Sequence, residues 1–73
     1  MTTYSAMTTT PGREPTETLG EALEALDPAP VGIGTFEIED GSGLWEVGAF
    51  FLEPPDEAGL ALLAAVHWAE PFA

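Results

Sequence analysis

The spacing of apolar and polar residues predicts a strand and a helix in the first half of the chain. Residues 2–10 are rich in threonine and precede Pro11-Gly12, which favours a strand that ends in a turn. In residues 14–26, apolar side chains recur at i, i+3, i+4 and i+7, the spacing of one helix face. Four glutamates make a second stripe on the same helix, and Asp27-Pro28-Ala29-Pro30 ends it. The apolar stripe is Leu19, Ala22, Leu23 and Leu26, and the acidic stripe is Glu14, Glu17, Glu21 and Glu24.

The middle of the chain predicts a hairpin. Residues 31–40 and 44–52 have strand character, and the short segment 41–43 (Gly-Ser-Gly) joins them. In the second strand, Trp45, Val47, Ala49 and Phe51 share one face by the period of two, and we expect them in the core under the helices. The opposite face is also apolar, at Leu44, Phe50 and Leu52. A sheet that is apolar on both faces predicts a covering partner from outside this chain.

A second helix is predicted over residues 56–68, with Leu60, Leu63, Ala64 and His67 on one side. Pro71 and Phe72 begin an element that the chain does not finish. The order β-α-β-β-α is that of a ferredoxin-like domain without its last strand. The prediction is one α+β domain over residues 1–73, a ferredoxin-like split β-α-β sandwich with the fourth strand missing or truncated. The first strand then has an unpaired outer edge, so self-association through it is expected.

Charge narrows the class of partner. The chain has 13 carboxylates and one basic side chain, Arg13, which gives a net charge of −12. Phosphate backbones and anionic membranes are repelled, so direct nucleic-acid or membrane binding is not expected, whereas a basic protein is attracted. The candidate docking residues for such a protein surround the hairpin. Two alternatives to docking remain: these residues are only a solvated strand face, or the acidity of the chain serves only its solubility. These residues are Glu37, Glu39, Asp40 and Glu46, with Glu37 and Glu39 on one face by the period of two.

Candidate chemistry is sparse. The pair Gly32 and Gly34 has the G-x-G spacing of a cofactor loop, but it lies at a strand and no helix follows it, which favours strand glycines. His67 is a lone histidine at a helix end, typical of a packing residue or a partner of the helix dipole. There is no cysteine, no secretory leader pattern, and no apolar run of membrane-spanning length. We therefore expect a cytoplasmic chain with no catalytic, cofactor or metal residues.

Two stretches carry a resemblance. Residues 27–51, which contain the hairpin Leu44-Trp45-Glu46-Val47, and residues 53–58 (Glu-Pro-Pro-Asp-Glu-Ala) before an Ala/Leu helix resemble the start of the ribosomal protein L-eleven methyltransferase (PrmA) family. The resemblance spans residues 4–65. It implies a ferredoxin-like N-terminal domain that grips the ribosomal protein substrate. In that family a helical linker and a Rossmann-type domain follow, and that domain binds S-adenosylmethionine.

The resemblance implies a specific function and leaves an alternative open. If the resemblance holds, the chain is expected to be the N-terminal substrate-binding part of an S-adenosylmethionine-dependent lysine or amino-group methyltransferase of a large-subunit ribosomal protein, truncated before the catalytic domain. The implied partner is that basic ribosomal protein. Alone, the chain lacks the cofactor site and is expected to be inactive. The alternatives are a stand-alone acidic ferredoxin-like module for ligand binding or regulation, and a truncated product without function.

Overall fold

The structure, a computed structural model that describes residues 3–73, has the five predicted elements in the predicted order. They are β1 (Tyr4–Thr10), α1 (Arg13–Glu24), β2 (Gly32–Glu37), β3 (Trp45–Phe51) and α2 (Glu57–Val66). The described residues thus confirm the α+β class, with three antiparallel strands and two helices. The predicted first strand began at residue 2, which lies outside the described residues.

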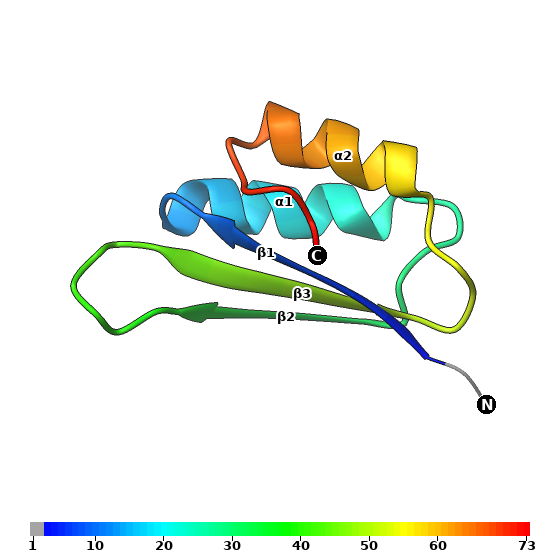
Figure 1. The fold of residues 1–73 in the computed structure, drawn as a ribbon, viewed down its shortest axis with the longest axis horizontal. Helices are drawn as coiled ribbons and strands as arrows, with labels where there is room; N and C mark the ends of the chain where they lie inside the picture. Colours follow the sequence, from blue (N-terminus) through cyan, green and yellow to red (C-terminus); the bar gives the residue numbers. More distant parts are fainter. Residues whose placement is uncertain (1–2) are drawn as a thin grey trace.

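The three strands form one sheet in the order β1-β3-β2. β3 is central and pairs antiparallel with both neighbours, from Tyr4↔Phe51 to Thr10↔Trp45 on one side and from Gly32↔Phe50 to Glu37↔Trp45 on the other. Both helices lie on the same side of this sheet, and the other side is covered by no element of the described chain (Figure 1). The fold is therefore a two-layer sandwich with one bare sheet face.

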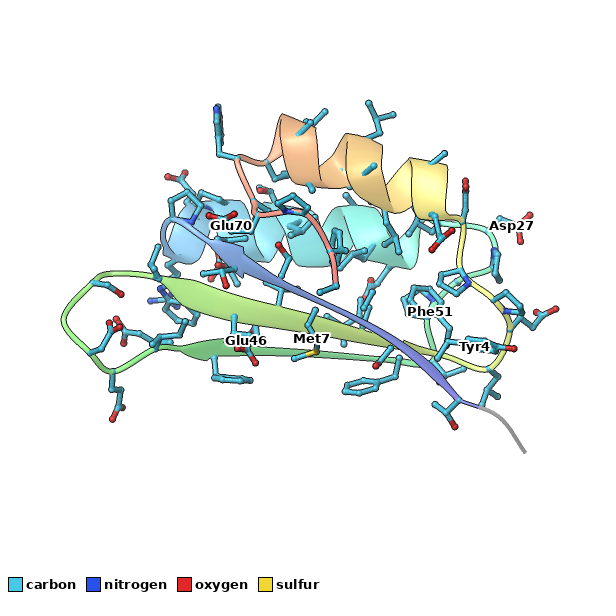
Figure 2. All side chains as sticks on the ribbon, viewed as in Figure 1. Tyr4, Met7, Asp27, Glu46, Phe51 and Glu70 are labelled. Carbon is cyan, nitrogen blue, oxygen red and sulfur yellow. The ribbon has the colours of Figure 1, made fainter. Side chains whose placement is uncertain are left out.

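The core lies between the sheet and the helices. Val47, Ala49 and Phe51 alternate along β3 and are fully buried (Phe51 is labelled in Figure 2). They pack against Leu19 and Leu23 of α1, which are also fully buried, and against Leu60 of α2. This confirms the predicted inner face of β3 and the predicted apolar side of each helix. Trp45, at the end of that face, is only half-buried.

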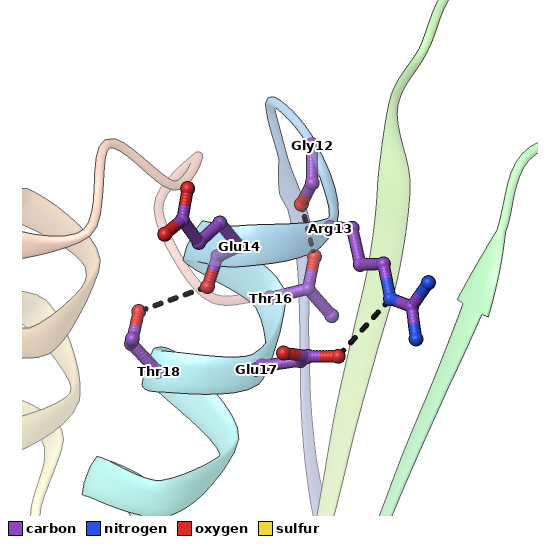
Figure 3. A network of polar contacts seen from close by, with 6 residues as sticks. All are labelled: Gly12, Arg13, Glu14, Thr16, Glu17 and Thr18. Atoms are coloured by element: carbon purple, nitrogen blue, oxygen red, sulfur yellow. Dashed lines mark hydrogen bonds and ion pairs between the residues drawn. The ribbon is translucent and has the colours of Figure 1, made fainter.

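α1 begins at a glycine, and threonine hydroxyls of its first turns donate back to backbone carbonyls of the preceding turn (Figure 3). Gly12 has a positive φ of 138°, a conformation that suits a residue without a Cβ, and provides no side-chain cap. The Thr16 hydroxyl donates to the Gly12 carbonyl at 2.6 Å, and the Thr18 hydroxyl donates to the Glu14 carbonyl at 3.2 Å. Arg13, the one basic side chain of the sequence, pairs with a glutamate of its own helix at 3.1 Å, on the surface.

α2 ends two residues earlier than predicted, at Val66. Trp68, expected inside the helix, has a positive φ of 56° and is 76% exposed. His67 is half-buried, with its ring Nδ1 2.9 Å from the Leu63 carbonyl, as befits a packing residue at a helix end. The change of direction at Trp68 leads residues 69–73 from the end of α2 back toward the sheet (Figure 1).

The returning segment corrects one prediction. The outer edge of β1 was expected to have no backbone partner, but residues 70–73 lie along part of it. The Met7 N–H donates to the Ala73 carbonyl at 3.1 Å, the Ala73 N–H donates to the Met7 carbonyl at 2.9 Å, and the Glu70 N–H donates to the Thr9 carbonyl at 2.9 Å. The Thr8 hydroxyl also donates to the Glu70 carbonyl. The expectation of an unpaired edge is therefore wrong between Met7 and Thr9.

Candidate protein-binding surface

The bare side of the sheet, here called the open face, carries the strand residues that alternate with the core residues. Neighbours along a strand point to opposite sides of the sheet. The even-numbered residues of β3 therefore point to the open face, together with the β1 and β2 residues that pair with them. The open face consists of Ser5, Met7 and Thr9 from β1, Glu46, Gly48 and Phe50 from β3, and Gly32, Gly34 and Phe36 from β2.

Two phenylalanines stand at either end of the open face. Phe36 is 52% exposed and Phe50 is 42% exposed. Of the residues predicted to make the outer face apolar, Phe50 is confirmed there, whereas Leu44 and Leu52 are exposed but lie just outside β3. Phe36 lies opposite Glu46 in the register, which is four residues from Phe50 along β3. At about 3.3 Å per residue along β3 and about 4.8 Å between neighbouring strands, the two positions are about 14 Å apart. The row between them contains Gly34 in β2 and Gly48 in β3, which have no side chains.

Met7 of β1 lies beside Gly48, which in turn lies beside Gly34, so the three residues form one row across the sheet. Its side chain lies over Gly48, where a Cβ would come within 2.6 Å of the Met7 sulfur (Met7 and Glu46 are labelled in Figure 2). Gly48 is buried by this contact, although it lies on the uncovered side of the sheet. Glycine at position 48 therefore allows the flexible Met7 thioether to lie close against the backbone of β3. Such side chains adapt to partners of different shape.

The structure separates the four acidic residues predicted to form one docking surface. Glu46 lies on the open face beside Phe36. Glu37 pairs with Trp45 and therefore points to the helix side. β2 ends at Glu37 rather than at Asp40, so Glu39 lies in the connecting loop, and the prediction that it shares a strand face with Glu37 is wrong.

Asp40 has a local role in that loop. Its Oδ1 accepts the Ser42 N–H at 2.9 Å, while the Ser42 hydroxyl accepts the Leu44 N–H at 3.2 Å. Hydrogen bonds from the Ser42 side chain and backbone lower the pKa of Asp40, which keeps it ionised. Gly41 and Gly43 both have positive φ, of 82° and 78°, which this tight connection requires. The carboxylate thus holds the hairpin loop in shape.

A denser acidic site lies elsewhere, between α1 and the outer edge of β2. Glu17, Glu21 and Glu24 recur at i, i+4 and i+7 along α1, and they border a groove of about 370 Å³. We call this the acidic groove; its other lining residues are Thr16, Gly20, Ile33 and Thr35. The glutamate stripe was visible in the sequence, but its position against β2 was not, because it depends on how α1 crosses the sheet. Ile33 and Thr35 pair with the core residues Ala49 and Val47, so the acidic groove lies on the helix side of the sheet, across the β2 edge from the open face.

The described residues show little else that carries chemistry. Gly32 and Gly34 lie within β2, which confirms that they are strand glycines. No group of three or more His, Cys, Asp or Glu side chains within residues 3–73 could hold a metal ion. In the same range, no helix is both long enough and apolar enough to cross a membrane.

Comparisons with protein-family models, with curated proteins and with solved structures found no match to this chain.

Proposed function

We propose that this chain is a recognition domain that binds a basic protein through the open face and the acidic groove. The observation that carries the proposal is a sheet face with two half-exposed phenylalanines that no described element covers, in a chain of net charge −12. Aromatic side chains supply most of the binding energy in many interfaces. Surrounding carboxylates steer a basic partner and select against acidic ones.

The more specific form of the proposal follows from the sequence resemblance. The chain would be the N-terminal substrate-binding part of an S-adenosylmethionine-dependent methyltransferase of a large-subunit ribosomal protein, acting in the cytoplasm. The fold would be ferredoxin-like, with residues 70–73 where the last strand begins. The strand order β1-β3-β2 and the antiparallel course of residues 70–73 along β1 support this topology. The methyl-donor site would belong to a separate domain.

The first test is binding of purified ribosomal protein L-eleven to the chain by calorimetry, with an unrelated basic protein for comparison. We expect Phe36→Ser and Phe50→Ser each to weaken binding at least tenfold, because interface aromatics are common hot spots. Leu62→Ser is the matched control, since Leu62 is 64% exposed on α2, away from the proposed surface. The control should bind as the parent does.

The second test measures the electrostatic contribution of the acidic groove to binding of the basic partner. Replacing Glu17, Glu21 and Glu24 by glutamine should slow association and reduce its dependence on salt, with a smaller effect on dissociation. Glu39→Gln, in the loop outside the groove, is the single-site control. If the phenylalanine variants bind as tightly as Leu62→Ser, or if L-eleven binds no better than the unrelated basic protein, the proposal fails. A stand-alone ligand-binding or regulatory domain would then be the better hypothesis.

A further inference from the structure

The outer edge of β2 directs backbone hydrogen-bonding groups away from the sheet. The Ile38 N–H donates to the Leu44 carbonyl at 2.9 Å, and this pair continues the register of β2 with β3. Backbone groups alternate in direction along an antiparallel strand, so the even-numbered positions of β2 bond toward β3. The N–H and carbonyl groups of Ile33 and Thr35 therefore point outward, and among the described residues no strand pairs with them.

These outward backbone groups lie at the acidic groove. Ile33 and Thr35 line the groove together with Glu17, Glu21 and Glu24 of α1. A residue directly opposite a strand position points to the same side of the sheet as that position. In a strand added to this edge, the residues opposite Ile33 and Thr35 would thus direct their side chains over the glutamates.

The spacing of the carboxylates suits alternate residues of an added strand. Glu17 and Glu24 are seven residues apart along α1, which is about 10 Å at about 1.5 Å per residue. Alternate residues of a strand are about 7 Å apart. α1 and β2 run side by side in opposite directions (Figure 1), so the row of glutamates follows the edge. Two basic side chains at alternate positions would both lie within that row.

Two glycines leave room at this edge that the packing of the chain does not require. Gly20 lines the groove in the middle of α1, where glycine is destabilising relative to alanine. A Cβ at Gly20 would have no atom within 4 Å, and the same holds for Gly34 between Ile33 and Thr35. Glycine inside a strand often marks the close approach of another backbone or a ligand.

The β2 edge is also separate from the part of the sheet that residues 70–73 extend. Those residues bond to β1, which lies on the other side of β3 from β2. A strand that continued from them would lie beside β1, and β2 would keep its position at the outer edge.

We propose that the β2 edge binds an extended basic-x-basic segment of the partner protein, added antiparallel to β2 with its two basic side chains over the acidic groove. Main-chain bonds supply affinity and alternate side chains supply specificity in such strand addition. The inference rests on the proposed binding of a basic protein and adds the mode of recognition. A second copy of this chain is a poorer occupant at low salt, because it brings the same three glutamates to the edge.

The probe is the peptide Lys-Val-Lys-Val-Lys, acetylated and amidated, with its central lysine opposite Thr35. At low salt it should shift the amide resonances of Ile33 and Thr35 in a saturable way and slow their hydrogen exchange. The peptide Lys-Lys-Val-Val-Lys has the same composition and charge, but no two of its lysines are two residues apart. It should bind at least fivefold more weakly.

Methylation of the peptide backbone tests the pairing without altering the protein. Methylating the nitrogen of the central lysine removes the donor to the Thr35 carbonyl, and binding should weaken about fivefold, the effect of one lost hydrogen bond of about 1 kcal/mol. Methylating the nitrogen of the following valine is the matched control, because that N–H points away from β2. The control should bind as the unmethylated peptide does.

Two substitutions test the protein side. Thr35→Pro removes the outward N–H at an edge position that tolerates proline, and should weaken peptide binding about fivefold, whereas Thr35→Val keeps the N–H and serves as the control. Ser5→Pro makes the same change at the β1 edge and should bind as the parent does. Gly20→Arg places a cation between Glu17 and Glu24, so it should weaken binding at least fivefold while raising the urea midpoint. Gly20→Ala should raise the midpoint and leave binding unchanged.

Three results would overturn the inference. Equal binding of the two peptides would mean that the glutamates attract positive charge without strand pairing, and equal binding after the two methylations would mean the same. Dimerisation of the parent at low salt, blocked by Thr35→Pro, would assign the edge to a second copy. If L-eleven binds through the phenylalanines and Thr35→Pro binds it as the parent does, the inference fails while the proposed function stands. If the peptide shows the expected dependences and L-eleven does not bind, the inference holds and the proposed partner is wrong.

Discussion

Two buried threonines join the end of β1 to the first turn of α1, and their hydroxyls should differ in importance. Thr10 and Thr16 are 0% and 1% exposed, and their Oγ1 atoms are 2.5 Å apart. The Thr16 hydroxyl lies 2.6 Å from the Gly12 carbonyl, which can only accept, so Thr16 gives its single proton there. Thr10 must then donate to Thr16, because its other contact, to the Trp45 carbonyl, is long at 3.4 Å.

Valine has nearly the shape of threonine, so substitution by valine tests the hydroxyls alone. Thr10→Val removes one hydrogen bond and leaves Thr16 bonded to Gly12, which should cost about 1 kcal/mol or less. Thr16→Val removes two bonds and leaves the buried Thr10 hydroxyl with only its long contact, which should cost about 2 to 3 kcal/mol. The double variant should be no less stable than Thr16→Val, because it leaves no hydroxyl without a partner.

Urea unfolding followed by tryptophan fluorescence can separate these effects. A chain of 73 residues has a total stability of about 4 to 11 kcal/mol, so a loss of 2 kcal/mol gives a clear shift of the midpoint. Thr18→Val is the control, since Thr18 is exposed, and it should change stability by less than about 0.5 kcal/mol. If Thr10→Val costs as much as Thr16→Val, the assignment of donors is wrong.

Other predictions concern the core, the hairpin loop and the methyl donor. Leu23→Ala should cost about 3 kcal/mol in the same urea assay, because Leu23 is fully buried. Ser42→Ala should raise the pKa of Asp40 toward its ordinary value in an NMR titration. The lowered pKa of Asp40 stabilises the folded loop above the ordinary aspartate pKa, and this contribution is lost as the pH falls through the lowered value. It should be smaller in Ser42→Ala, which loses the hydroxyl but keeps the backbone N–H that bonds to Asp40. Calorimetry should find no micromolar binding of S-adenosylmethionine, since Gly32 and Gly34 lie in a strand.

The sequence predicted the elements well where burial follows a short repeat. Alternation along β3 identified Val47, Ala49 and Phe51, and the i, i+3, i+4 spacing in α1 identified Leu19 and Leu23, because each pattern is local and reports one buried face. Element ends were less accurate. β2 stops at Glu37, before the glycine turn, although a strand had been expected to continue to Asp40.

Contacts between distant segments were not predictable from these patterns. The bonds from Glu70 and Ala73 to β1 join residues more than sixty positions apart, and residues 70–73 have no periodicity that indicates a strand. The acidic groove depends on the angle at which α1 crosses the sheet, which side-chain spacing does not determine. The sequence therefore predicted docking residues near the hairpin, where acidic residues are close in sequence. In the structure, Glu17, Glu21 and Glu24 of α1 instead line one groove beside β2.

The two edges of the sheet differ in chemistry, and this difference yields a last prediction. At the β1 edge, residues 70–73 cover Met7 to Thr9, which narrows the exposed part available for the self-association expected from the sequence. At the β2 edge no described element pairs with the strand, but the acidic groove lies beside it. Charges along an edge oppose pairing with a like-charged copy and favour a basic strand.

Replacing Glu17, Glu21 and Glu24 by glutamine should therefore have opposite effects on two kinds of association. Binding of the basic partner should weaken, whereas dimerisation measured by sedimentation should strengthen at low salt, where the parent is protected by its charge. Near physiological salt, screening over about 8 Å should reduce the difference between the two chains. Ser5→Pro in the same background would show which edge pairs, since it blocks β1 and leaves β2 intact. If the glutamine variant remains as monomeric as the parent at low salt, charge beside β2 is not what keeps that edge free.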